Sequence, residues 1–77
     1  LLPVTYLYFW VRGLPVPGWS VKPTYNENHE LQSLIQNEWT INFENCQTMG
    51  NAKIPTVINV IYNNTKINFV ITQWKSQ

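Results

Sequence analysis

The sequence has little of the side-chain chemistry on which most enzymes and metalloproteins depend. It holds one cysteine, Cys46, one histidine, His29, and no aspartate. A single cysteine cannot form a disulfide within the chain, and no group of metal ligands has the usual spacing. Neither Cys46 nor His29 has the orienting partner and oxyanion hole that nucleophilic catalysis needs. We therefore predict that the chain is not an enzyme and has no catalytic residue, metal site or cofactor.

Charge is scarce as well. Only 12% of the residues are charged, and the formal net charge is +1 at pH 7. Proteins that bind nucleic acids usually cluster their Lys and Arg residues, whereas the five basic residues here are scattered along the chain. The composition therefore argues against a nucleic-acid partner.

Long hydrophobic runs are also missing. The opening residues 1–11 are apolar, but they are fewer than the about 20 residues needed to cross a bilayer, and Pro3 and Thr5 interrupt them. We predict no membrane span and a soluble chain. Asn63-Asn64-Thr65 matches an N-glycosylation acceptor, which would allow secretion, although so short a motif often occurs by chance.

The chain has 77 residues, enough for one domain with a modest core. We predict a single domain, residues 1–77, and because the first residue is Leu1 and not Met, we expect a processed chain or a fragment of a larger polypeptide. The entropy cost of ordering so short a chain nearly cancels the gain from apolar burial. A protein partner or a second copy of the chain is therefore expected.

The first half of the sequence predicts a strand, a rigid loop and a helix. Residues 4–12 are rich in aromatic and β-branched types, which favour a strand. Pro15 and Pro17 lack the backbone N–H that pairs strands, so the strand ends before them. Residues 19–21 are expected to form a short edge strand. Leu31, Leu34 and Ile35 recur at helical spacing after a capping pattern, which predicts a helix over residues 27–37.

The second half predicts three strands. Residues 39–44 alternate between apolar and polar types, residues 47–53 form a turn, and residues 54–62 and 66–74 flank a hairpin turn at Asn63-Asn64-Thr65. The fold class is therefore α+β, a small antiparallel sheet of four to five strands with one helix packed on one face. The predicted core joins Ile41, Phe43, Ile67, Phe69 and Ile71 to Leu31, Leu34 and Ile35 of the helix.

A row of aromatic side chains is the most distinctive candidate for a binding surface. On a strand, Tyr6, Tyr8 and Trp10 would share one face, opposite Leu7, Phe9 and Val11. Asparagine amides on other strands would flank this row if their faces coincide. The predicted binding residues are Tyr6, Tyr8, Trp10, Trp19, Asn42, Asn59, Asn68 and Trp74.

Three functions are compatible with such a surface. The leading hypothesis is a non-catalytic interaction module that contacts a protein partner or a second copy of itself, since Trp and Tyr favour interface cores. The alternative is a carbohydrate-binding, lectin-like module that stacks sugar rings on the aromatic residues and binds them through Asn amides. Single-stranded nucleic-acid binding by base stacking is the weakest alternative.

One local resemblance points toward glycans. Leu31-Gln32-Ser33-Leu34, Thr40-Ile41 and Asn45-Cys46 resemble the helix and the next strand of Shiga-type toxin B subunits. The resemblance implies a small OB-fold pentamer that binds glycans. It covers a small part of the chain, and the disulfide within each subunit of that family cannot form with Cys46 alone, so we do not assign the chain to it.

Overall fold

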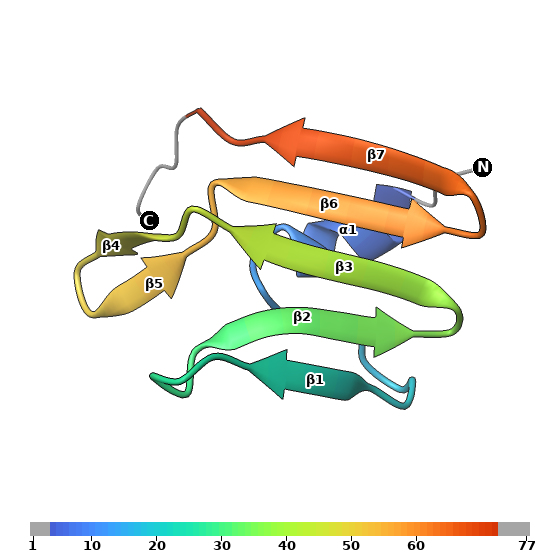
Figure 1. Cartoon of the computed structure of the whole chain (residues 1–77), viewed down its shortest axis with the longest axis horizontal. Coiled ribbons are helices and arrows are strands. Elements are labelled where there is room, and N and C mark those ends of the chain that lie inside the picture. The colour runs from blue at the N-terminus through green and yellow to red at the C-terminus, as the bar shows by residue number, and fades with distance from the viewer. Residues whose placement is uncertain (1–3, 73–77) are drawn as a thin grey trace.

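The computed structural model describes residues 4–72, which form one short helix and two antiparallel sheets (Figure 1). The five-stranded sheet has the order β1-β2-β3-β6-β7, and β4 and β5 pair as a separate hairpin. The fold is therefore mostly β, compatible with the predicted small α+β class. The elements are α1 (Val4–Trp10), β1 (Lys22–Tyr25), β2 (Leu31–Gln36), β3 (Trp39–Glu44), β4 (Gln47–Met49), β5 (Ala52–Ile54), β6 (Val57–Tyr62) and β7 (Thr65–Val70).

The strands of the second half follow from their alternating pattern. β3 has the predicted bounds and buries Ile41 and Phe43 while its intervening residues face the other side. β6 and β7 form the predicted hairpin, shorter at both outer ends, and pair from Tyr62↔Thr65 outward. Asn63 adopts a φ of 54° in its two-residue turn, a conformation that asparagine tolerates. These three strand predictions are confirmed.

The predicted strand over residues 4–12 is wrong, because this segment forms the helix α1. Gly13 has a φ of 71° and donates to the Trp10 carbonyl, while the Leu14 amide donates to the Phe9 carbonyl. These two bonds form a Schellman motif, the common way to end a helix. The aromatic residues of the segment have a modest preference for strands, and this local ending together with tertiary packing overrides it.

The predicted helix over residues 27–37 is also wrong. Asn26 accepts hydrogen bonds through Oδ1 from the amides of Asn28 (2.9 Å) and Glu30 (3.0 Å). These bonds close the loop between β1 and β2, and His29 takes a φ of 63° within it. The following residues form β2, so Leu34 points into the core whereas Ile35, predicted to be buried, is exposed.

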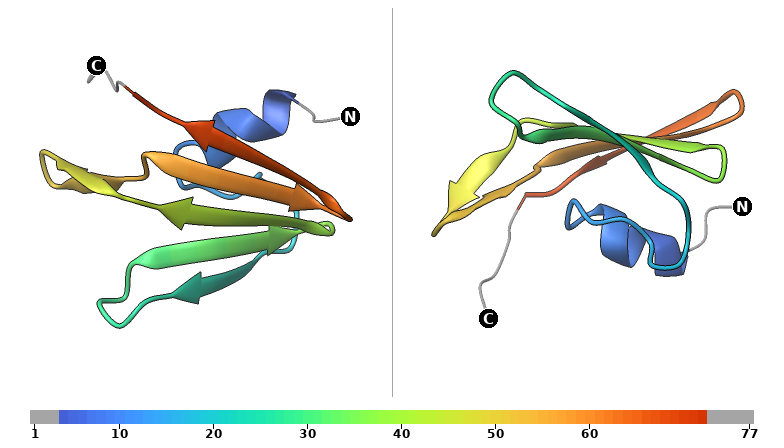
Figure 2. Two further views of the ribbon diagram at one scale, coloured as in Figure 1. Left: turned by 45° about the horizontal axis from the view of Figure 1, so that its top comes forward. Right: turned by 90° about the horizontal axis from the view of Figure 1, so that it is seen from below.

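Two smaller predictions also change. The edge strand expected at residues 19–21 lies at β1 instead, and Pro23 is tolerated there because an edge strand can lack one ladder donor. The turn expected at residues 47–53 contains the short strands β4 and β5. This hairpin leaves the end of the large sheet and bends toward the side on which α1 lies (Figure 2).

The core lies between the large sheet and the segment that contains α1 and the loop after it. Its buried apolar residues are Trp10, Val16, Leu34, Ile41, Phe43, Ile58 and Val60. Gln36 is buried with them and bonds to both Trp10 and Val16. Among the other predicted core residues, Phe69 and Ile71 are partly buried against this cluster.

Candidate functional site

Two neighbouring pockets open beside the loop that follows α1. Gly13 and Leu31 line both, so the pockets adjoin where this loop meets the end of the β1–β2 hairpin. We call them the apolar pocket and the polar pocket. The apolar pocket is lined by Gly13, Pro15, Val21, Pro23, Tyr25, Leu31 and Leu34. The polar pocket is lined by Arg12, Gly13, Asn26, Glu30, Leu31, Gln32, Phe43, Asn45, Cys46, Lys53 and Pro55.

The apolar pocket has a volume of about 250 Å³. Pro15 comes from the loop after α1, and Pro23 lies opposite Leu34 in the β1–β2 register, so both prolines meet the inner face of the sheet. Val21, directly before this edge strand, and Tyr25, its last residue, are exposed. The pocket is therefore an open apolar surface that a hydrocarbon chain can enter.

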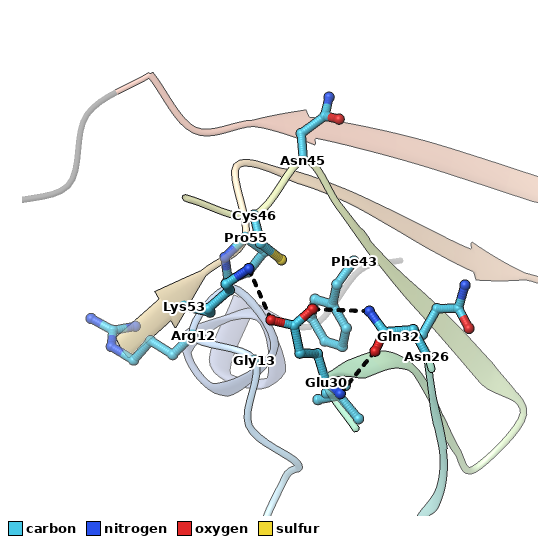
Figure 3. A pocket seen from close by; sticks show the side chains of 11 residues that line it. Arg12, Gly13, Asn26, Glu30, Gln32, Phe43, Asn45, Cys46, Lys53 and Pro55 are labelled. Atoms are coloured by element: carbon cyan, nitrogen blue, oxygen red, sulfur yellow. Dashed lines mark hydrogen bonds and ion pairs between the residues drawn. The ribbon is translucent and has the colours of Figure 1, made fainter. Parts of the chain in front are cut away.

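The polar pocket has a volume of about 340 Å³ and is organised by the Glu30 carboxylate (Figure 3). Lys53 Nζ lies 2.9 Å from Glu30 Oε2, and Asn26 Nδ2 donates to Glu30 Oε1 at 3.0 Å. The hydrogen bond from Asn26 and the nearby Lys53 hold the pKa of Glu30 below its ordinary value. The hydrogen bond to Glu30 and the negative charge of its carboxylate in turn raise the pKa of Lys53. At neutral pH both groups are charged, and the pair joins the β1–β2 loop to β5.

Cys46 also faces this pocket (Figure 3). Partial desolvation raises the pKa of the Cys46 thiol, and the negative charge of Glu30 raises it further. The thiol is therefore protonated at neutral pH and is a weak nucleophile. The residue as a whole is exposed.

The predicted aromatic binding residues do not form an exposed row. Trp10 is completely buried, and Tyr6 is partly buried between it and Trp19, with ring centroids 5.8 Å and 4.4 Å away. Tyr8 does not join Tyr6 and Trp10: its ring contacts Phe9 edge-on and lies beneath the Arg12 guanidinium, and the residue remains 58% exposed. Trp74 lies outside the described residues.

The three predicted amide residues are brought together. Asn42, Asn59 and Asn68 lie opposite one another across β3, β6 and β7. They lie on the face opposite the core, whereas Tyr6, Trp10 and Trp19 lie on the α1 side. Asn59 is buried and donates to Glu44 at 2.8 Å. The amides and the aromatic residues therefore do not share one surface.

Sequence reasoning missed both pockets. Glu30 and Lys53 are far apart in the chain. No local sequence pattern predicts that the β1–β2 loop and the β4–β5 hairpin lie next to each other. The available signal was Gly13 followed by Pro15 and Pro17, a pattern typical of the end of a helix and the start of a constrained loop. This signal would have located the end of α1 and the loop after it, which lines both pockets.

Among residues 4–72, no group of three His, Cys, Asp or Glu side chains is placed to hold a metal ion. Over the same residues, no helix combines the length and the apolar character needed to cross a membrane.

The comparisons with known proteins give one consistent result. A family model described as outer membrane lipoprotein LolB matches residues 1–74. Curated relatives named outer-membrane lipoprotein LolB are 28% identical in Coxiella burnetii, 30% in Marinobacter nauticus and 30% in Pseudomonas fluorescens. These alignments cover 96%, 99% and 95% of this chain, but only 35%, 38% and 36% of the relatives. The chain thus spans little more than a third of their length.

These matches correct the functional hypotheses drawn from the sequence. The chain is not a generic module that binds through an aromatic sheet face, because it matches a family of outer-membrane lipoproteins and the strand that would carry the face is a helix. Neither self-association nor carbohydrate binding has support, and the resemblance to Shiga-type toxin B subunits fails because residues 31–36 form a strand. The prediction that the chain is not an enzyme is confirmed, because LolB proteins are not enzymes.

Proposed function

Because the chain belongs to the family of the outer membrane lipoprotein LolB, we propose that it is part of a protein that receives lipoproteins from LolA at the outer membrane. In this function the apolar pocket contacts an acyl chain of the incoming lipoprotein. The protein partner expected from the sequence is then LolA together with the lipoprotein that it delivers.

The observation that carries the proposal is the composition and exposure of the apolar pocket. Its walls are Pro, Val, Tyr and Leu side chains together with Gly13, and it opens beside an exposed edge strand. Burying hydrocarbon against such side chains is favourable by about 25 cal/mol per Å². The volume of about 250 Å³ lies just below the usual range for ligand pockets, which suits a segment of an acyl chain.

The test uses the full-length protein that contains this chain. LolA loaded with an acylated lipoprotein is mixed with the protein, and transfer is measured by co-purification. Val21→Asp places a charge in the apolar pocket, and we expect it to reduce transfer and the binding of a fluorescent acyl probe severalfold. Val70→Asp is the matched control, because Val70 is an exposed valine on the sheet face that does not line either pocket. Equal transfer by the Val21→Asp and Val70→Asp proteins would refute the proposed role of the pocket.

A further inference from the structure

We propose that the polar pocket binds the first peptide groups of the same acylated ligand, next to the lipid-modified residue. This inference rests on the proposed function, since it requires the acyl chain to occupy the apolar pocket. It adds to the proposed function a separate contact with the peptide that follows the acylated residue.

The first argument is adjacency. The two pockets share Gly13 and Leu31, so a ligand that passes from one to the other crosses a single boundary. An acylated protein terminus has the matching order of chemistry, with hydrocarbon at one end and a polar chain directly after it. A purely apolar ligand would leave the polar pocket to water.

The second argument is the pairing of donors and acceptors in the polar pocket. Lys53 is 55% exposed and its ammonium has three donors, of which one is directed to Glu30 among the described residues. The Glu30 side chain is 33% exposed, and its carboxylate oxygens accept from Asn26 and Lys53 while retaining lone pairs. The pocket therefore presents a cationic donor and an anionic acceptor side by side (Figure 3).

The third argument is complementarity. A peptide group offers one carbonyl acceptor and one N–H donor a short distance apart, so it can bond to Lys53 and Glu30 together. A phosphate head group offers acceptors alone and would be repelled by the Glu30 carboxylate. The side-by-side pair therefore favours a peptide over an anionic phospholipid.

The experiment compares three probes that carry the same two palmitoyl chains, using the full-length protein. They are a peptide with an N-terminal diacylglyceryl cysteine, dipalmitoylglycerol, and dipalmitoylphosphatidylglycerol. The test variant is Lys53→Gln. The matched control is Lys66→Gln, because Lys66 lies on the face of β7 that points away from the core and lines neither pocket. Affinity is measured by displacement of a fluorescent acyl probe. Alkylation of Cys46, followed at the level of its own peptide by mass spectrometry, reports whether the polar pocket is occupied.

We expect Lys53→Gln to weaken binding of the lipopeptide about tenfold, the size of one charge-assisted hydrogen bond, and to leave dipalmitoylglycerol unaffected. The lipopeptide should slow Cys46 alkylation, and dipalmitoylglycerol should not. Equal effects of Lys53→Gln on the lipopeptide and dipalmitoylglycerol, or equal protection of Cys46 by the phospholipid, would overturn the inference. Failure of the proposed function looks different, because then Val21→Asp would leave the binding of every probe unchanged.

Discussion

The side chain of Gln36 makes three hydrogen bonds although only 1% of the residue is exposed. Its Oε1 accepts from Trp10 Nε1 (3.0 Å) and from the Val16 amide (2.9 Å), and its Nε2 donates to the Val16 carbonyl (3.1 Å). One amide thus satisfies polar groups of the helix and of the loop after it, where no water reaches. Within residues 4–72, no buried side-chain nitrogen or oxygen lacks a hydrogen-bond partner.

We expect Gln36→Leu to lower the free energy of unfolding by about 3 kcal/mol, because the variant keeps the side chain's bulk and leaves buried donors and an acceptor unpaired. Urea unfolding followed by tryptophan fluorescence measures the change. Gln32→Leu is the control, since Gln32 is an exposed glutamine on the same strand. If the free energy of unfolding falls equally in the two variants, the three hydrogen bonds of Gln36 make no net contribution to stability.

At the scale of elements, the sequence predicted the second half of the chain well. β3 and the β6–β7 hairpin depend on strict alternation and on a two-residue turn, and both signals are local. Residues 4–10 and 31–36 were exchanged, one predicted as a strand and found as a helix, the other the reverse. Residues 4–10 are apolar at nearly every position and fit either period, whereas the spacing of Leu31, Leu34 and Ile35 fits a helix better than a strand, so tertiary packing overrides the local pattern there.

The β4–β5 hairpin was predicted only as a turn, and its attachment to the rest of the molecule could not be predicted at all. The ion pair between Lys53 and Glu30 links it to the β1–β2 loop, more than twenty residues away in the chain. Such a contact depends on how the sheet places two loop ends. No local pattern in the sequence therefore singles out Glu30 or Lys53.

This link predicts a specific dependence on pH. The folded-state pKa of Glu30 is lowered, so its contribution to stability is present above the unfolded value of 4.5 and is lost as the pH falls through the folded-state pKa. Glu30→Gln should reduce the loss of stability between pH 5 and the acid end of the unfolding curve, as measured by urea unfolding at a series of pH values. Glu27→Gln is the control, because Glu27 is an exposed residue of the same loop and is not part of the ion pair. Identical profiles for wild type and Glu30→Gln would contradict the assignment.

At the scale of the whole molecule, the candidate site could not be predicted because it lies between elements. Of the residues proposed from the sequence, Asn42, Asn59 and Asn68 do meet, since the alternation of their strands was read correctly. The aromatic residues were placed on the wrong element. The pockets need the correct position of α1, of the loop after it and of two hairpin ends at once.

The two layers of the molecule are joined by a continuous series of aromatic contacts. Trp19 contacts Tyr6, Tyr6 contacts Trp10, Trp10 lies 5.6 Å from Trp39, and Trp39 lies 4.6 Å from Tyr62. The series therefore runs from the loop through α1 to β3 and β6. A helix of seven residues is too short to be stable by itself in water, so α1 depends on these contacts.

We expect Trp10→Ala to lower the free energy of unfolding by about 4 kcal/mol, because it removes a buried ring and leaves a cavity between the layers. The near-ultraviolet circular dichroism should weaken as well, since the remaining aromatic rings lose their fixed neighbour. Tyr8→Ala on the same helix should change stability by less than about 0.5 kcal/mol, because its ring is mostly exposed. If Trp10→Ala were as mild as Tyr8→Ala, packing against the sheet would not hold α1, and it would not fix the position of the loop after α1 that lines both pockets.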